Sequence, residues 1–258
     1  KDSSTGTPNN VCSSDVSDMV GYGKTFFVVT SADDVYRYNA SSGQFNDGAN
    51  ALGGGVHMLC VYGQRFYVTA SSSQKIYSFA PADYNSITTS SSYTLDIANK
   101  AWNVTSITHI RDVSDGIWVF TLNQSEAGCW VFKWDGVTAN DPNSAYFLPD
   151  SFGVMSSVIK GDYPWILDSN GQLLYFNGGT FVNAPNGKLP IDNPKYLKNS
   201  LSAVNDRWIH PNGMTVVNGK IRASINNEYE DNGATIEERL PSGVWEYSPE
   251  NGWSHIIP

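Results

Sequence analysis

The chain has 258 residues, of which 40% are hydrophobic, 13% aromatic and only 16% charged, whereas an average globular domain has about 25% charged residues. This composition excludes a disordered chain. The net charge of −9 has the wrong sign for a protein that neutralises nucleic-acid phosphates. The longest apolar runs, such as Ile117–Phe120, are far shorter than the roughly 18 residues of a membrane-spanning helix. We therefore expect one large domain with neither nucleic-acid binding nor a membrane span.

The N-terminal residues 1–15 are rich in Ser and Asn and are predicted to form an arm or linker. They contain neither an initiator Met nor the apolar segment of a signal peptide, so we expect a processed or excised chain. The cysteines Cys12, Cys60 and Cys129 cannot all pair within one chain, and none has CxxC spacing. Buried free thiols or tail residues are the expected states.

The chain contains an internal repeat. Tyr22–Val29 is matched forty positions later by Tyr62–Thr69, with Tyr, Gly, Phe and Val shared in place. Each segment is followed by a short aromatic alternation, Val35–Tyr38 and Ile76–Phe79, of the kind that half-buried strands show. These pairs of segments predict repeated β-hairpins.

Three looser copies of the hairpin pattern follow: Asp115–Phe120 with Trp130–Trp134, Asp162–Leu167 with Leu173–Phe176, and Asn218–Arg222 with Val244–Tyr247. One turn position recurs with spacings of 40, 53, 46 and 57 residues, at Gly23, Gly63, Gly116, Asp162 and Gly219. Such spacings are typical of a repeated unit with loops of variable length.

Each unit also has an apolar stretch before its turn, such as Val56–Val61, and a strand-like tail after its aromatic pair, such as Ala145–Leu148. Four short strands in each of five units predict an all-β fold, a β-propeller of about five four-stranded blades over residues 16–258. Its equivalent strands should hold Phe26, Phe66, Trp118 and Ile166. The segment Leu95–Val104 is interpreted as strand and loop rather than helix. A β-sandwich with similar hairpins is the alternative.

The longest interruption of the repeat is predicted at residues 183–213, where four prolines oppose continuous strand pairing. Long loops in compact domains are usually functional or disordered. We expect this excursion to pack on a neighbouring chain with Trp208 as anchor. The predicted partner-binding residues, which lie in the excursion or near the ends of elements, are Trp208, Tyr196, Ile209, Trp102 and Trp253.

The motifs that are typical of catalytic or cofactor-binding sites are absent from the sequence or only partly matched. No Gly-x-Ser-x-Gly elbow and no phosphate-binding Gly-Lys-Ser/Thr loop of the required spacing is present. His57 and His109 fall on predicted innermost strands. We interpret each as a polar strand residue bound by its neighbours, and a metal site formed by the two imidazoles is the alternative. Asp168–Gly171 begins like a calcium loop but lacks its later acidic ligands, so a hairpin turn is predicted. The acidic strip Asn227–Arg239 is interpreted as a solvated loop. We expect no enzyme, no metal and no cofactor.

Two segments resemble known propellers. Trp245–Trp253 is similar to kelch-type repeats, and Pro211–Ile221 followed by Gly243–Tyr247 looks like propeller segments of tailed-phage virion proteins, over about the last fifty residues. The resemblance implies a non-enzymatic virion component of a tail, neck or fibre, bound to other virion proteins in a symmetric assembly. The alternative is a secreted, extracellular propeller that binds or processes glycans, with a host-surface glycan as ligand.

Overall fold

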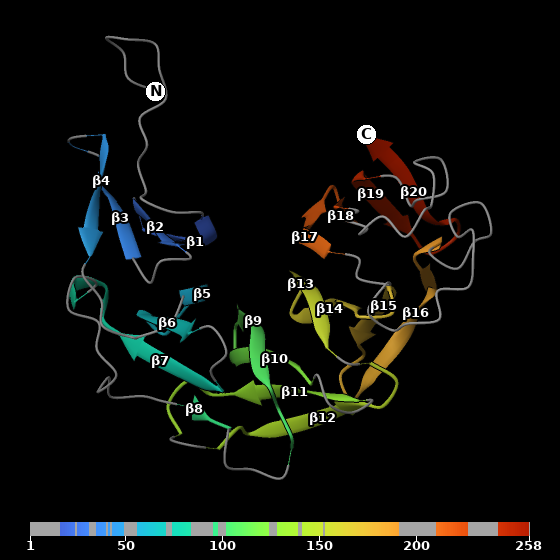
Figure 1. Ribbon diagram of the computed structural model, residues 1–258, viewed down its shortest axis with the longest axis horizontal. Helices are drawn as coiled ribbons and strands as arrows, with labels where there is room; N and C mark the ends of the chain where they lie inside the picture. Colours follow the sequence, from blue (N-terminus) through green and yellow to red (C-terminus); the bar gives the residue numbers. More distant parts are fainter. Residues whose placement is uncertain are drawn as a thin grey trace, which may run out of the picture. The chain divides into compact units, whose positions relative to one another are not determined.

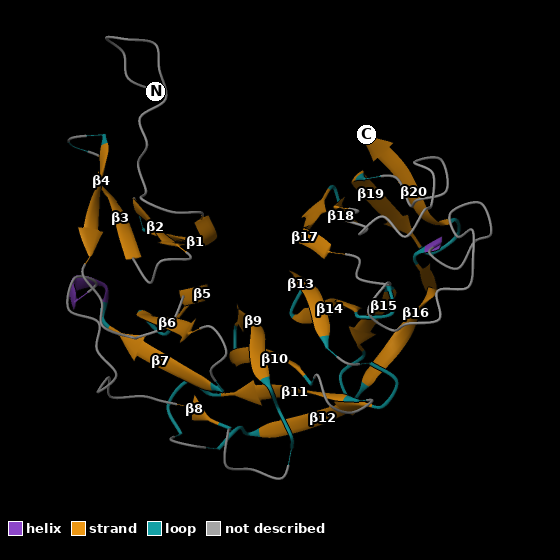
Figure 2. Ribbon diagram, in the orientation of Figure 1, coloured by secondary structure: helices purple, strands orange, loops and turns teal. Residues whose placement is uncertain are grey.

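The computed structural model describes residues 16–23, 25–30, 35–39, 41, 43–48, 56–70, 74–83, 95–97, 102–123, 128–138, 141–151, 153–190, 210–226 and 242–257. Strands make up most of this part of the chain (Figure 2), together with the short 3₁₀-helix η1 (Pro81–Asp83). No helix within it is long and apolar enough to cross a bilayer.

The strands form five four-stranded sheets, called blades 1 to 5 (Figure 1). Blade 1 holds β1 (Val16–Tyr22), β2 (Thr25–Thr30), β3 (Val35–Asn39) and β4 (Gln44–Gly48). Blade 2 holds β5 (Val56–Tyr62), β6 (Arg65–Ala70), β7 (Lys75–Phe79) and β8 (Leu95–Asp96). Blade 3 holds β9 (Ser106–Val113), β10 (Gly116–Leu122), β11 (Cys129–Trp134) and β12 (Ser144–Leu148). Blade 4 holds β13 (Val154–Lys160), β14 (Tyr163–Asp168), β15 (Gln172–Phe176) and β16 (Phe181–Lys188). Blade 5 holds β17 (His210–Val217), β18 (Lys220–Asn226), β19 (Gly243–Ser248) and β20 (Gly252–Ile257).

Within each blade the strands are hydrogen-bonded in chain order, which is the strand order of a propeller blade. The predicted four-stranded units are therefore confirmed. Phe26, Phe66 and Trp118 lie in the second strands of blades 1 to 3, and Ile166 lies in the second strand of blade 4, as expected. The segment Leu95–Val104, interpreted as strand and loop, contains the short strand β8.

The first strands repeat one irregularity. The pairing register shifts between Val16 and Asp18 in β1, and at the corresponding place in three other first strands, between Val56 and Met58, Val154 and Ser156, and Pro211 and Gly213. In every case the extra residue lies five positions before the end of the strand. A β-bulge bends its strand and increases the local twist. The repeat thus extends from sequence to backbone geometry.

The chain packs as two compact units, Lys1–Val119 with Lys133–Ser144, and Phe120–Phe132 with Ala145–Pro258, with the division passing through blade 3. The core of the first unit joins blades 1 and 2 around Phe66, whose ring centroid lies 4.3 Å from Phe27 and 5.3 Å from Phe79. Val29, Val35, Val68 and Tyr77 complete it.

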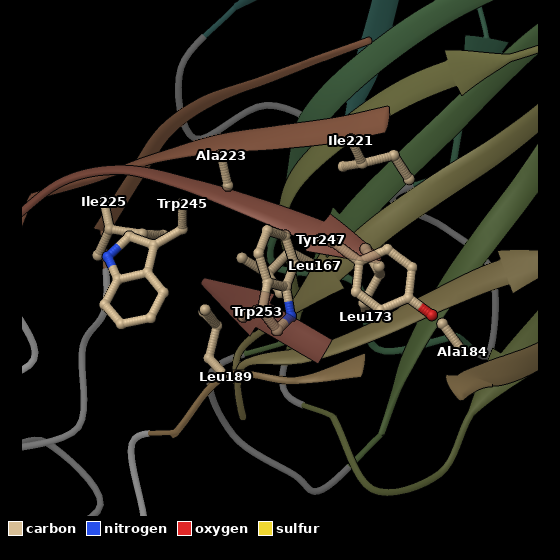
Figure 3. Close-up of a cluster of buried hydrophobic side chains, with 10 residues drawn as sticks. All are labelled: Leu167, Leu173, Ala184, Leu189, Ile221, Ala223, Ile225, Trp245, Tyr247 and Trp253. Carbon is tan, nitrogen blue, oxygen red and sulfur yellow. The ribbon is translucent and has the colours of Figure 1, made fainter. Parts of the chain in front are cut away.

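The core of the second unit joins blades 4 and 5 (Figure 3). Its buried members come from six strands and the residue after β16: Leu167, Leu173, Ala184, Leu189, Ile221, Ala223, Ile225, Trp245, Tyr247 and Trp253. They follow the alternation that places every second strand residue on one face. On β18, for example, Ile221, Ala223 and Ile225 are buried, while Ser224 between them is exposed.

Ring donors link neighbouring blades by binding main-chain carbonyls. In the first unit, Tyr67 Oη on β6 donates a hydrogen bond to the Gly136 carbonyl, in the turn before β12, at 3.0 Å. In the second unit, Tyr247 Oη donates to the Pro185 carbonyl at 2.6 Å, and Trp253 Nε1 donates to the Gly187 carbonyl at 2.8 Å. Both acceptors are on β16, so blade 5 is linked to the edge strand of blade 4.

The predicted excursion at residues 183–213 is too long at both ends. Its first residues belong to β16 and its last to β17. Pro185 is tolerated because β16 is the edge strand of its sheet and leaves the ladder between the pairs Leu174–Asn183 and Gln172–Lys188. Pro211 is tolerated beside the bulge of β17. Residues 191–209 lie outside the described residues.

We predict that Gly136→Ala lowers the free energy of unfolding more than Gly219→Ala. Both glycines have a positive φ, +77° and +76°, so alanine is strained equally at the two sites. A Cβ at Gly219 meets no atom within 4 Å, whereas at Gly136 it would lie 2.8 Å from Tyr67 Oη. Displacing this ring should add about 1–3 kcal/mol, measurable by urea denaturation. Equal losses in the two variants would contradict the tight packing of Gly136 on Tyr67.

Candidate functional site

The structure describes only two of the five predicted partner-binding residues. Tyr196, Trp208 and Ile209 lie outside the described residues, so their role stays a prediction. Trp102 is half-buried in the turn before β9, and its role as a contact residue also stays a prediction.

Trp253 is placed in the interior, which corrects its prediction as a contact residue. Its side chain is 8% exposed and belongs to the core between blades 4 and 5, where Figure 3 shows it among Leu167, Tyr247 and Leu189. The indole N–H is bound to the Gly187 carbonyl. The position of Trp253 near the chain end suggested exposure, but the strand alternation of β20, in which Trp253 pairs with Tyr247, turns it inward.

Sequence reasoning missed the aromatic side chains that are exposed. Phe147 on β12 and Tyr163 on β14 are each 49% exposed. Both belong to what we call the aromatic cluster, a set of rings from blades 3 and 4 in the second unit: Trp130, Tyr146, Phe147, Tyr163, Phe176 and Phe181. The alternation Ala145–Leu148 was recognised as a strand, but the sequence alone did not show which of its faces is covered.

Strand β12 connects the two halves of the aromatic cluster, because consecutive strand residues point to opposite faces. On one side, the Phe147 centroid lies 5.0 Å from that of Trp130. On the other side, the Tyr146 centroid lies 5.0 Å from that of Phe176, which is 6.0 Å from Tyr163. Two half-exposed rings thus rest on partly or fully buried ones.

The ring of Phe147 packs directly against the backbone at Gly128. A Cβ at Gly128 would overlap that ring, and its φ of +109° also favours glycine. Asn123, just after β10, donates a hydrogen bond from Nδ2 to the Gly128 carbonyl at 3.3 Å. Phe147 therefore packs on Gly128 and Trp130 and leaves the rest of its ring as an apolar surface, suited to stacking or apolar burial rather than to proton transfer.

The innermost strands of the first unit carry charges. Arg111 on β9 and Asp18 on β1 form an ion pair with an N–O distance of 3.8 Å, and Arg111 Nη1 also donates to the Ile110 carbonyl at 3.0 Å.

Cys60 on β5 is buried, and burial together with the charge of Asp112 raises the pKa of its thiol well above the ordinary value. A thiol that stays protonated is unreactive.

Cys129 is buried in the second unit. Burial raises the pKa of its thiol to about 12, although a hydrogen bond with Ser151 acts to lower it. Both Cys60 and Cys129 are free thiols, as predicted, and Cys12 lies outside the described residues. His57 occupies the bulge of β5 and His109 lies on β9. Within the described ranges, no three His, Cys, Asp or Glu side chains come together as metal ligands.

Asp168–Gly171 forms the turn between β14 and β15, which confirms the predicted hairpin turn. Asp168 Oδ1 accepts hydrogen bonds from the Asn170 and Gln172 amides at 2.9 and 2.7 Å. Burial raises the pKa of this carboxyl to about 6, although these amide bonds and Lys188 oppose the rise. Asp168 is the only buried carboxylate side chain among the residues that the structure describes.

Asp135, in the turn before β12, has a pKa that is lowered, whereas that of Asp168 is raised. Partial burial would raise the pKa of its carboxyl, but hydrogen bonds from Thr138, Val137 and Asn143 outweigh burial and lower it to about 2. The bonds are 2.8 Å from the Val137 and Thr138 amides and 2.7 Å from Thr138 Oγ1. Both carboxylate oxygens of Asp135 therefore accept hydrogen bonds from the connection between β11 and β12, which Asp135 organises.

The chain is similar in fold to solved β-propellers. The WD40 β-propeller domain of Doa1 superposes with a TM-score of 0.55 at 10% identity, over 95% of this chain and 83% of that one. YCF48 from Cyanidioschyzon merolae gives 0.53 at 13% identity, over 95% and 73%. The extracellular domain of BT4673 from B. thetaiotaomicron gives 0.53 at 13% identity, over 84% of this chain, which spans only 27% of that structure. No protein-family model and no curated protein matches the chain.

Blade topology and these similarities together define the class. The protein is an all-β protein with the β-propeller fold and five four-stranded antiparallel blades. At 10–13% identity the similarity describes the fold alone, and function has to be argued from the side chains.

We predict that Trp253→Ala lowers the free energy of unfolding by about 3–5 kcal/mol, because it removes a buried indole and leaves a cavity. Trp253→Phe should cost about 1–3 kcal/mol, since it keeps a ring but leaves the Gly187 carbonyl without its donor. Urea denaturation measures both. Unchanged stability in Trp253→Ala would restore the prediction that this residue serves a partner rather than the core.

Proposed function

We propose that the protein is a non-enzymatic β-propeller that serves as a structural or docking module and contacts other proteins through exposed aromatic side chains. The observation that carries the proposal is the aromatic cluster, in which Phe147 on β12 of blade 3 and Tyr163 on β14 of blade 4 are each half-exposed. Aromatic residues are enriched in the centres of protein interfaces, where a few of them supply most of the binding energy.

Packing of the exposed rings on their neighbours favours binding. Phe147 packs against Gly128 and Trp130, and Tyr163 packs against Phe176. A side chain that is already ordered loses little conformational entropy when a partner covers it. The few charges of the chain make apolar burial and hydrogen bonding the main sources of affinity, so binding should depend weakly on salt.

The setting that we propose is a virion, in a tail, neck or fibre-associated position and among other virion proteins. This part of the proposal rests on the resemblance of Pro211–Ile221 and Gly243–Tyr247 to propeller segments of tailed-phage virion proteins. Trp208 remains the proposed anchor of the segment between β16 and β17. An extracellular, glycan-binding propeller is the alternative, because exposed aromatic rings also stack on sugars.

Photo-crosslinking from position 147 tests the docking proposal. The full chain carries p-benzoylphenylalanine in place of Phe147, or, as control, in place of the exposed Asp150 of the same unit. We expect a discrete adduct with one protein partner from position 147 and none from position 150. The same variants and Phe147→Ala are applied to a glycan array. Array binding that disappears in Phe147→Ala, without a protein adduct, would favour the glycan alternative and contradict protein docking.

We predict that the purified chain has no glycosidase turnover on a broad glycan panel, because none of the motifs for nucleophilic or paired-acid catalysis is recognised in its sequence. The measurement is release of reducing ends over time. Cleavage of one substrate, together with its loss when a single carboxylate is changed to the amide, would overturn the non-enzymatic part of the proposal.

A further inference from the structure

The turn between β14 and β15 is hydrogen-bonded to two segments of the second unit, the residues that precede β13 and the end of β16. Ser169 donates its amide to the Gly153 carbonyl at 3.0 Å, and the Asn170 side chain donates to the Asp150 carbonyl, so the turn is bound to the segment that enters the blade. Lys188 Nζ donates to the Asn170 carbonyl at 2.6 Å, and the Leu189 amide donates to the Gly171 carbonyl at 2.8 Å. The end of β16 is thereby bound to the same turn.

One buried carboxyl group organises this turn. Asp168 is 7% exposed, and its Oδ1 accepts the amides of Asn170 and Gln172, on both sides of Gly171. The conformation that presents the Gly171 carbonyl to Leu189 thus depends on a group that can gain or lose a proton. A buried carboxylate is costly unless it is well paired, and here its hydrogen-bond donors are neutral amides.

Blade 2 contains the same connection without the carboxyl group. The Ile97 amide, just after β8, donates to the carbonyl of Gln74, just before β7, at 3.0 Å. The register places Ala70 of blade 2 where blade 4 has Asp168, since Ala70 pairs with Val56 and Asp168 pairs with Val154. The connection therefore needs no acid at this position, and blade 4 adds one.

The groups that face Asp168 come from three elements. Lys188 on β16 is the cation that acts on its charge, and Cys129 on β11 is a neighbouring thiol that stays protonated. Asp150 supplies a carbonyl to the turn, and its side chain is exposed. The balance of burial against the amides and Lys188 leaves the carboxyl with a pKa of about 6, above its ordinary value of 3.8.

We propose that the β14–β15 turn is an acid-stabilised latch, which holds the end of β16 on blade 4 while Asp168 is protonated and loosens as Asp168 ionises. The closed turn binds the proton more tightly than the open, solvated turn. The closed turn is therefore most stable when the pH is below the pKa that Asp168 has in the open turn. Its stability falls as the pH rises toward the higher pKa that Asp168 has in the closed turn. The window lies between about pH 4 and pH 6. Two pKa units correspond to about a 100-fold change in the opening equilibrium.

Amide hydrogen exchange tests the latch within the unmodified protein. The Leu189 amide reports on the latch, and the Ile97 amide reports on the equivalent connection of blade 2. After division by intrinsic exchange rates, the opening constant at Leu189 should rise by up to about 100-fold between pH 4 and pH 7. The constant at Ile97 should not rise with pH, because the ion pair of Lys75 and Asp96 beside this connection favours closure when the carboxylate is charged. Parallel pH profiles at Leu189 and Ile97 would overturn the proposal.

Two variants separate ionisation of Asp168 from general loosening. Asp168→Asn keeps an acceptor oxygen but has no proton to lose, so the profile at Leu189 should become level. Lys188→Met removes the cation that favours the carboxylate, so the midpoint of the Leu189 profile should move to higher pH, whatever happens to its baseline. A pH-dependent profile that persists in Asp168→Asn, or a midpoint that stays in place in Lys188→Met, would contradict the assignment.

Discussion

Main-chain carbonyls that lie outside the β-ladder need hydrogen-bond donors, and ring donors from a neighbouring blade supply them. Strand β16 departs from regular pairing around Pro185, and its carbonyls at Pro185 and Gly187 are bound by Tyr247 and Trp253. The Gly136 carbonyl, in a turn, is bound by Tyr67. An unpaired buried carbonyl is costly, so each link fixes the position of one blade on its neighbour within its unit. The apolar cores then pack in a defined register.

Much of the fold could be predicted from the sequence, because each hairpin is determined by residues in its own turn and strands. Two-residue turns such as Asn218–Gly219 require residues of positive φ, and Asn and Gly are the types that adopt it. The alternating aromatic pairs after each turn gave the third strands, and the spacing of the turns gave five units. The bulges of the first strands in blades 1, 2, 4 and 5 have no such signature, since Ser17, His57, Met155 and Asn212 share no side-chain type.

The candidate site was harder to predict, because burial depends on which faces of neighbouring blades meet. Trp253 and Phe147 are both aromatic residues on the fourth strand of a blade. Trp253 faces the core beneath β16, whereas Phe147 rests on Gly128 with one face open. The prolines near β16 and β17 suggested a longer excursion, yet edge position and bulges accommodate Pro185 and Pro211. The carboxyl of Asp168 was recognised as part of a turn, but its burial comes from segments distant in sequence.

The most direct test of the central claim compares two tyrosines by urea denaturation. Tyr247→Phe removes the hydroxyl bound to the Pro185 carbonyl, whereas Tyr175→Phe removes a hydroxyl from a half-buried ring that stacks on Trp165. If carbonyl links hold blade on blade, Tyr247→Phe lowers the free energy of unfolding by about 1–3 kcal/mol, and Tyr175→Phe changes it by less than about 0.5 kcal/mol. Equal effects of the two substitutions would contradict the account.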